Sequence, residues 1–256
     1  MGNMSAGIAT LFYKLGFFAR TLRGVGSFIK RWNVSSKILV MQILFTFVQA
    51  MGISTLLALG IGGAVNIIGF PFLERLSQQQ LMYSLLIIII TRELGPLLTA
   101  FIVIARSATA IATEIAGMVI SHEVEAYISV GVDPIEHLAV PRFLGVVISV
   151  FLLNVYFSLF GLAGSFLVAQ VFFTIPADYY FGNLLHDLSI QDLFISFVKS
   201  IAFGMIISIG AVTEGLAVER ARTEVPIAGL RAVSNAFAGC IVVAIILSTM
   251  YYMVLA

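Results

Sequence analysis

The chain has 256 residues, of which 60% are hydrophobic and 11% are charged, and its formal net charge is +1. A water-soluble domain carries roughly a quarter charged residues, so most of this exterior must face lipid. Composition therefore excludes a soluble enzyme, a disordered chain and, because basic residues are not in surplus, a nucleic-acid-binding protein. The single cysteine, Cys240, excludes an intramolecular disulfide, a secreted disulfide scaffold and an all-cysteine metal site.

The first 35 residues carry an amphipathic helical pattern and not the features of a signal peptide. Six apolar residues recur at spacings of three and four: Leu11, Leu15, Phe18, Leu22, Val25 and Ile29. The basic residues Arg20, Arg23, Lys30 and Arg31 fall on the opposite side, while Lys14 lies outside the pattern. A helix of this kind lies in the headgroup plane with its arginines toward anionic lipid. We therefore expect an interfacial helix over residues 1–35, followed by a single membrane domain over 36–256.

Long apolar runs predict five membrane-spanning helices, since one span needs about 20 mostly apolar residues. Three runs contain no charged residue, and they cover 38–73, 143–177 and 232–256. Two more carry a few charges and cover roughly 81–118 and 193–213. The connecting segments are then about 63–80, 119–142, 174–192 and 214–231. Because the runs lack the period-two alternation of barrel strands, the predicted fold class is an all-α integral membrane protein.

Lysine and arginine residues near the ends of the spans indicate the orientation. The lysines and arginines gather in the N-terminal arm, with Arg142 in segment 119–142 and three more arginines in 214–231, whereas the opposite side holds Arg75 as its only lysine or arginine and has three aspartates in 174–192. We expect a cytoplasmic N-terminus and a C-terminus on the outer side.

The second span places nearly all of its polar residues on one side. On a helix that turns 100° per residue, Arg92, Thr99 and Arg106 follow one another in seven-residue steps, and Glu93 and Glu114 form a neighbouring row. Ionisable groups in a membrane are costly and usually face a bundle interior or a watery cavity. Arg92 and Glu93 lie about 17 Å into the span by the rise of a helix, near mid-membrane.

Lys199, in the fourth span, is a natural counter-charge for Glu93 or Glu114, and the sequence leaves that choice open. Pro96 predicts a kink beside the charged pair, because it removes a backbone donor. Two interpretations of the buried charges stay open as well. They form either an ion-pair network that only fixes helix packing or a functional polar pathway.

Segment 121–134 predicts a short amphipathic helix on the cytoplasmic side. Ser121 is expected to cap it, and Glu123 and Glu125 suit its first turn. Val124, Tyr127 and Ile128 make its apolar face, and Gly131 can end it. Asp133 and Pro134 then read as the start of a new helix. The segment is interpreted either as a docking helix for a partner or as a plain interfacial connector.

Several catalytic and binding motifs are missing from the sequence. It contains no G-x-x-x-x-G-K-[ST] loop for nucleotide phosphates and no G-x-S-x-G nucleophile elbow. His122, His137 and His186 show no metal-ligand spacing. We therefore expect no metal site, no bound cofactor and no catalytic residue in this chain.

Three sets of residues resemble the signature of the MlaE family of ABC-transporter permeases. The first is the run Arg92-Glu93-Leu94-Gly95-Pro96-Leu97-Leu98-Thr99-Ala100, the second is Ala105-Arg106-Ser107 with Ala112-Thr113-Glu114-Ile115, and the third is Gly131-Val132-Asp133-Pro134 with Val140-Pro141-Arg142. The resemblance covers roughly residues 35–215. The family's plan of five spans and an N-terminal interfacial helix agrees with the topology predicted above.

The resemblance implies a homodimeric permease in a bacterial inner membrane. Its ATP and Mg would be bound by two cytoplasmic ATPase subunits, and typical systems add a small STAS-domain protein and a periplasmic hexamer of MCE-domain protein. Such complexes move phospholipids between the inner and outer membranes. Glycines at 60, 62, 63, 161 and 164 would permit close helix approach at an interface.

Carried over residue by residue, the resemblance places the ATPase-coupling helix at about 121–131. The residues that match this region are His122, Glu123, Glu125, Tyr127, Gly131, Asp133 and Pro134. Arg92 and Glu93 match the family's charged pair beside a central lipid cavity, with Arg106, Glu114 and Lys199 as further polar candidates. The outer ends of the first two spans would line that cavity through Val65, Phe72, Leu73 and Leu76.

The chain also departs from the family pattern. Ser121-His122-Glu123 stands where the family usually has Thr-Glu-Gln, so Glu123 would take the acidic role about 100° around the helix. After residue 215 the usual Gly-rich and Thr-rich stretch is replaced, and the last span lacks its common acidic residue.

Two other functions remain as alternatives. One is an ion-coupled secondary transporter that uses Arg92, Glu93, Arg106, Glu114 and Lys199 as a relay, although the five spans show no evident inverted repeat. The other is a non-transporting membrane scaffold that recruits partners through segment 121–134.

Overall fold

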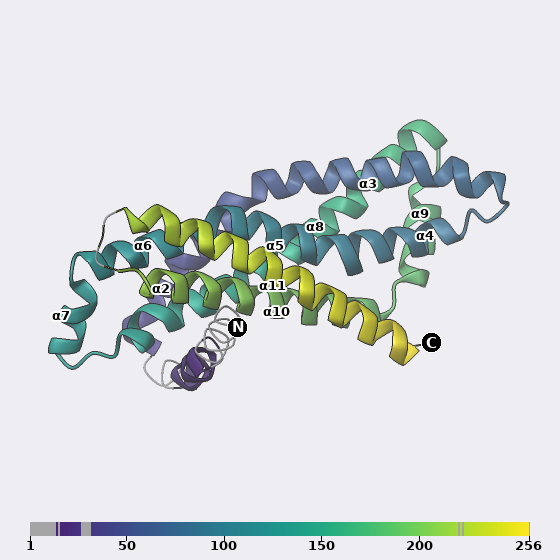
Figure 1. Ribbon diagram of the computed structural model, residues 1–256. Coiled ribbons are helices and arrows are strands. Elements are labelled where there is room, and N and C mark those ends of the chain that lie inside the picture. Colours follow the sequence, from purple (N-terminus) through teal and green to yellow (C-terminus); the bar gives the residue numbers. More distant parts are fainter. Residues whose placement is uncertain (1–13, 15, 27–31, 220, 222, 256) are drawn as a thin grey trace, which may run out of the picture. The chain divides into compact units, whose positions relative to one another are not determined.

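The computed structural model describes residues 14, 16–26, 32–219, 221 and 223–255, and the regular structure of this part is helical (Figure 1). Five stretches are long and apolar enough to cross a membrane, namely Ile38–Arg75, Leu81–Ile120, Ile135–Phe173, Ile190–Leu216 and Glu224–Met253. The predicted all-α membrane fold with five spans is therefore confirmed. The third and fifth spans begin earlier than predicted, because their helices continue beyond the apolar runs into segments that carry charge.

The first span consists of α2 (Trp32–Ile43), η1 (Leu44–Val48) and α3 (Gln49–Arg75). The second consists of α4 (Leu81–Leu86), η2 (Ile87–Leu94), α5 (Gly95–Val103), η3 (Ile104–Ala108) and α6 (Thr109–Ile120). The third comprises η4 (Ile135–Ala139) and α8 (Val140–Phe173), the fourth is α10 (Ile190–Leu216), and the fifth is α11 (Glu224–Leu255). Two short helices connect spans, α7 (Glu123–Ser129) and α9 (Ala177–Asp187). The η segments are π-helical, a form that is frequent at functional sites.

The chain divides into two compact units, each assembled from three separated stretches. Unit 1 contains Met1–Thr46, Val103–Ser149 and Gly204–Ile241, and unit 2 contains Phe47–Ile102, Val150–Phe203 and Val242–Ala256. The boundaries fall within long helices, so the division into an arm over 1–35 and one domain over 36–256 stays a prediction.

In unit 1, the described part of the N-terminal arm, residues 16–26, is helical and packs on the start of α8. The Phe18 ring lies 6.4 Å from the Phe143 ring, measured between centroids. Phe17, Thr21 and Gly24 are buried, whereas Leu22 of the predicted apolar stripe is exposed. The buried face is thus rotated from the prediction, because the helix approaches α8 closely at Gly24. Leu11, Leu15, Ile29, Lys30 and Arg31 lie outside the described residues.

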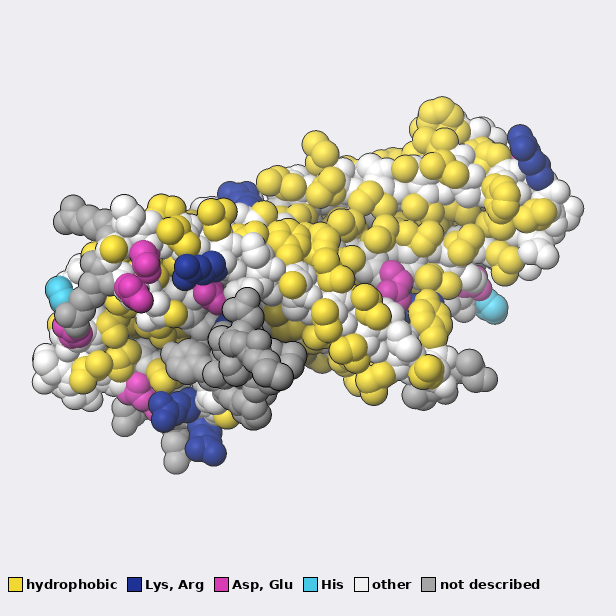
Figure 2. Space-filling model, in the orientation of Figure 1, with side chains coloured by type: hydrophobic (Ala, Val, Ile, Leu, Met, Phe, Trp, Pro, Cys, Tyr) yellow, Lys and Arg dark blue, Asp and Glu magenta, His cyan; other side chains and the backbone are white. Residues whose placement is uncertain are grey.

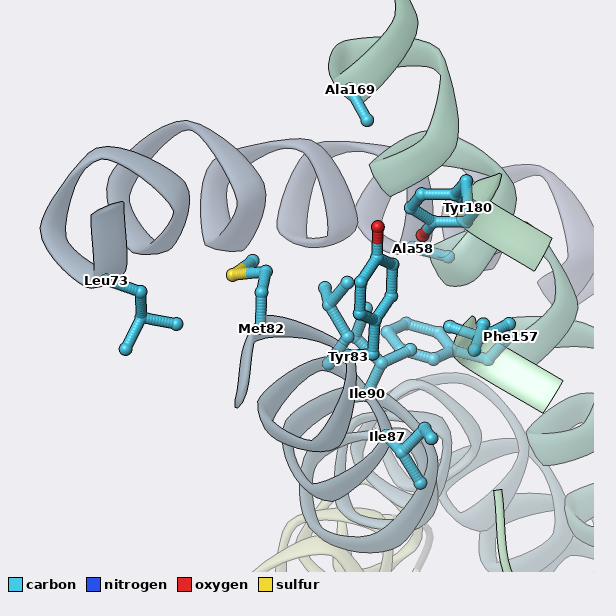
Figure 3. Close-up of a cluster of buried hydrophobic side chains, with 11 residues drawn as sticks. Ala58, Leu73, Met82, Tyr83, Ile87, Ile90, Phe157, Ala169 and Tyr180 are labelled. Atoms are coloured by element: carbon cyan, nitrogen blue, oxygen red, sulfur yellow. The ribbon is translucent and has the colours of Figure 1, made fainter. Parts of the chain in front are cut away.

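Unit 2 has an apolar core between α3, α4, η2, α8 and α9 (Figure 3). Its buried members are Ala58, Leu73, Met82, Tyr83, Leu86, Ile87, Ile90, Phe157, Ala169, Tyr180 and Leu184. The Tyr83 and Tyr180 rings meet edge to face with their centroids 5.6 Å apart. Outside the core, hydrophobic side chains also cover much of the face shown in Figure 2. Because lipid tails are as apolar as these side chains, close packing and not exclusion from water holds the core together.

Helix α9 lies in segment 174–192, which was predicted only as a connection. Tyr180 and Leu184, one helical turn apart, are its buried residues, and this i, i+4 spacing is the pattern that could have revealed it. The Tyr180 hydroxyl donates to the Leu162 carbonyl oxygen at 3.3 Å. Burial raises the pKa of the Tyr180 hydroxyl above its ordinary value.

Helices α3 and α8 approach each other at glycines. A Cβ atom on Gly62 would collide with the carbonyl group of Gly161, and one on Gly164 would lie 2.7 Å from Leu59 Cα. Next to this contact, Asn66 Nδ2 donates to the Ser165 carbonyl oxygen at 3.0 Å and to Ser165 Oγ at 2.9 Å. Small residues let helix backbones come close in a membrane, so these glycines are used inside the chain.

We expect Gly62→Ala to lower the free energy of unfolding by about 1–3 kcal/mol, because its methyl group overfills the contact with α8. Gly60 is the matched control in the same helix, since nothing lies within 4 Å of a Cβ built there. Gly60→Ala should be neutral or stabilise by up to about 1 kcal/mol through helix propensity. Unfolding experiments in detergent micelles measure the free energy of unfolding of both variants. Equal effects of the two substitutions would contradict the packing described.

Candidate functional site

A cluster of charged side chains lies within unit 2, where η2, α10 and α11 meet. Arg92 and Glu93 belong to η2, and Asp192 and Lys199 belong to α10. Arg92 and Asp192 are buried, and Lys199 is only 1% exposed. Two cations and two anions lie together here, so the formal charges of the cluster cancel.

The Arg92 guanidinium is held by a carboxylate and two tyrosines. Its Nη1 donates to Asp192 Oδ1 at 3.1 Å, and its Nη2 donates to the Tyr252 hydroxyl. Its Cζ atom lies 5.0 Å from the centroid of the Tyr251 ring and 4.8 Å from that of Tyr252. These distances are within the range of cation–π attraction, so Arg92 is stabilised by its counter-ion and by two ring faces.

Lys199 uses all three of its N–H groups. Nζ donates to Glu93 Oε2 at 2.7 Å, to Ser248 Oγ at 2.9 Å and to the Arg92 carbonyl oxygen at 3.1 Å. Ser248 Oγ in turn donates to Glu93 Oε2 at 2.9 Å. The counter-charge of Lys199 is therefore Glu93. Glu114, the other candidate, pairs instead with Arg142 in unit 1, at 2.7 Å from Nη2.

Pro96 explains why side chains of α10 bond to the backbone of the second span. In an α-helix the carbonyl of residue 92 would accept from the N–H of residue 96, and in a π-helix the carbonyl of residue 91 would do so. Proline has no N–H, so it leaves such carbonyls in need of a donor. Lys199 Nζ donates to the Arg92 carbonyl oxygen at 3.1 Å, and Ser196 Oγ donates to that of Thr91 at 2.8 Å.

Asp192 was predicted only as one of the outer-side acids, and the structure makes it a member of the cluster. Ser189 precedes α10, and its Oγ accepts from the Asp192 N–H at 3.2 Å. Asp192 Oδ2 in turn accepts from the Ser189 N–H at 3.3 Å and from Ser189 Oγ at 2.7 Å. This arrangement is a capping box, whose spacing was visible in the sequence as Ser189 followed three residues later by Asp192. Ser248, Tyr251 and Tyr252 had no such signal, because only tertiary packing brings α11 to Arg92.

The remaining predicted pathway residues have other surroundings. Arg106, in η3, is exposed, and like Glu114 it belongs to unit 1. Of the residues in the first span that were predicted to line a lipid cavity, Leu73 is buried in the core of unit 2, and Val65 packs against that core. Phe72 and Leu76, at the C-terminal end of α3, are exposed.

The predicted coupling helix forms as α7 (Glu123–Ser129), whose apolar residues Val124 and Tyr127 are half-buried. Its cap differs from the prediction. His122, with φ 61°, is the residue before the helix, while Ser121 ends α6 and donates through Oγ to Glu123 Oε1 at 3.0 Å. His122 Nδ1 lies 2.9 Å from Glu125 Oε2.

The end of α7 follows the predicted pattern. Gly131 has φ 76°, its N–H donates to the Ile128 carbonyl at 3.0 Å, and the Val132 N–H donates to that of Tyr127 at 2.9 Å. This pair of bonds is a Schellman motif. Asp133 Oδ1 then accepts from the Ile135 N–H at 2.9 Å, which starts the next helix with Pro134 in its first position.

No group of three or more His, Cys, Asp or Glu side chains that could hold a metal ion occurs in the part of the chain that the structure describes.

The fold and the cluster define a multi-pass α-helical membrane protein with paired charges inside its apolar spans. A sequence profile of the permease MlaE family matches residues 39–250, so the chain belongs to the MlaE permease family. This confirms the resemblance inferred from the motifs around Arg92 and Asp133.

Curated relatives agree with the family assignment. A probable ABC transporter permease protein of Rickettsia typhi is 27% identical over 172 residues, which are 67% of this chain and 66% of the relative. One of Synechocystis is 30% identical over 127 residues, 50% of this chain and 48% of the relative. One of Pyropia yezoensis is 30% identical over 124 residues, 48% of this chain and 47% of the relative. The chain thus spans just under two thirds of the Rickettsia relative and about half of the other two.

We expect Lys199→Met to lower the free energy of unfolding by about 2–3 kcal/mol. Loss of one partner from a buried ion pair costs about 3–5 kcal/mol, and the Glu93 side chain is still 32% exposed, which reduces the penalty. Glu93→Gln added to Lys199→Met should recover part of the loss, since no unpaired carboxylate then remains. If the double variant loses as much free energy of unfolding as the two single variants lose together, the two residues are not coupled.

Proposed function

We propose that the chain is the permease subunit of an ATP-driven ABC transporter that moves phospholipids between the inner and outer membranes of a bacterium. Two copies would form the membrane core. The membership of the MlaE permease family is the observation that carries the proposal, and the names of the relatives as probable ABC transporter permeases support it.

The charge cluster supports a lipid as the substrate. A phospholipid has a charged head and long apolar tails, so its route needs polar groups set among apolar walls. Arg92, Glu93, Asp192 and Lys199 supply such groups inside spans that are otherwise apolar. In this proposal the cluster forms part of the lipid route, and a headgroup competes with Asp192 for the Arg92 guanidinium.

Helix α7 supports coupling to a separate ATPase. Glu123, Glu125 and Ile128 are exposed, and they present both charge and apolar surface next to the end of α6. The sequence carries no phosphate-binding loop, so ATP and Mg would be held by the ATPase subunit. Closure of the ATPase pair would push α7 and thereby the second and third spans.

Location and further partners follow from the same proposal. The basic residues of the arm and of 214–231 favour a cytoplasmic N-terminus and a periplasmic C-terminus in the inner membrane. On the outer side we propose an MCE-domain protein as partner, and on the cytoplasmic side a STAS-domain protein beside the ATPase.

One experiment separates this proposal from its two alternatives. The chain is purified from its native membrane, and the proteins that accompany it are identified. An ATPase together with an MCE-domain protein supports the lipid transporter. The absence of both would favour an ion-coupled secondary transporter, and different cytoplasmic partners would favour a scaffold.

We expect Arg92→Ala to reduce lipid transfer in reconstituted vesicles at least tenfold while assembly with the ATPase persists, since a loss of about 1.4 kcal/mol of transition-state stabilisation is tenfold in rate. Arg75→Ala is the matched control, because Arg75 lies at the exposed end of α3. A variant that fails only to assemble would favour the interpretation of the cluster as a packing network.

We expect Glu123→Lys to insert normally in the membrane but to lose ATP-dependent lipid transfer, because it reverses a charge on the exposed surface of α7. Glu74→Lys provides the same reversal at the far end of α3 and should leave the ATPase bound. Coupled transfer that is unchanged in Glu123→Lys would remove the assignment of α7 as the coupling helix.

A further inference from the structure

A groove in unit 1 brings an ion pair to the surface of apolar helices. Its volume is about 430 Å³, and α2, η1, α6 and α8 line it. The residues used below are Ile38, Met41, Gln42, Phe45, Glu114 and Arg142. Four of the six come from the start of the first span, and they make one apolar wall around the Gln42 amide.

The two charges occupy different positions in the groove. The Arg142 side chain is 7% exposed, and it donates through Nη2 to Glu114 Oε1 at 2.7 Å and through Nη1 to the Leu138 carbonyl oxygen at 3.0 Å. Its Nε has no hydrogen-bond partner within the described ranges. The Glu114 side chain is 52% exposed. The groove thus presents an accessible carboxylate with a buried guanidinium behind it.

The surroundings of the groove suit a place beside lipid at the depth of the headgroups. Met41 and Phe45 on its wall are exposed apolar residues, as expected for a surface that contacts acyl chains. The N-terminal arm packs through Phe18 on Phe143, the residue next to Arg142. Arg20 and Arg23 of the arm are exposed, and an amphipathic helix with a basic face lies in the headgroup plane.

We propose that this groove binds a phospholipid with a primary ammonium headgroup, taken from the leaflet that holds the N-terminal arm. The ammonium group donates to the Glu114 carboxylate, the phosphate lies toward Arg142 and the Gln42 amide, and the tails cover Met41 and Phe45. An anionic headgroup without an amine is disfavoured, because it meets the exposed carboxylate first and finds Arg142 already paired. This site is separate from the Arg92 cluster and does not depend on the transport proposed above.

The test measures lipid contact at a single labelled position. Cys240 is the only cysteine, so Cys240→Ser provides a background for Met41→Cys carrying a bimane fluorophore. The protein is reconstituted in phosphatidylcholine vesicles that contain a minor share of brominated phosphatidylethanolamine or brominated phosphatidylglycerol, whose acyl chains quench the label. Leu56→Cys, at an exposed position on α3 that does not line the groove, reports the bulk lipid.

For the label at position 41, we expect a given degree of quenching at a mole fraction of phosphatidylethanolamine that is about two- to fivefold lower than that of phosphatidylglycerol. This ratio is the one expected for one partly exposed ion pair. At Leu56 the two lipids should quench equally. Glu114→Gln should remove the preference at Met41, and Glu114→Asp, which keeps the charge, should retain its direction.

Three outcomes would overturn the proposal: equal quenching by the two lipids at Met41, stronger quenching by phosphatidylglycerol, or a preference that survives Glu114→Gln. If Glu114→Gln fails to insert, the comparison of the two lipids in the protein with Glu114 intact still decides. This test does not measure lipid transfer, so its failure would leave the proposed permease function standing. Failure of the proposed permease function would likewise leave this lipid site standing.

Discussion

Lys199 ends in three N–H donors, and each meets an acceptor within unit 2: a carboxylate, a hydroxyl and a backbone carbonyl. A lysine at this depth is tolerated only when its charge is matched and its donors are used. Glu93 supplies the charge, and Pro96 supplies the carbonyl by leaving Arg92 without its usual helical donor. The carbonyl freed by Pro96 and the carboxylate of Glu93 therefore meet at one lysine, and α10 is attached to the second span at this point.

The same requirement accounts for Arg92. Its partners come from α10 and α11, so a single guanidinium joins three spans through Asp192, Tyr251 and Tyr252. A cluster in which charges cancel can be buried without a resident counter-ion, yet each of its bonds can be exchanged for one to a polar ligand. This property suits the lipid route proposed above.

In unit 1 the ion pair of Arg142 and Glu114 is asymmetric, with the cation buried and the anion half exposed. It lies next to Phe143, on which the N-terminal arm packs through Phe18. The two ion-pair sites thus differ in kind: the Arg92 cluster is closed by its own residues, whereas the groove at Glu114 still offers a carboxylate to a ligand.

The sequence by itself determined the five spans, the short helix closed off by Gly131 and the family, because apolar run length, helical periodicity and turn chemistry are local properties. It also identified Arg92, Glu93 and Lys199, since charges in apolar runs stand out in any window. Only the tertiary structure decided that Lys199 meets Glu93 while Glu114 meets Arg142, and that Asp192, Ser248 and two tyrosines complete the cluster. Those pairings join residues up to 160 positions apart, so helix packing and not local pattern selects the partners.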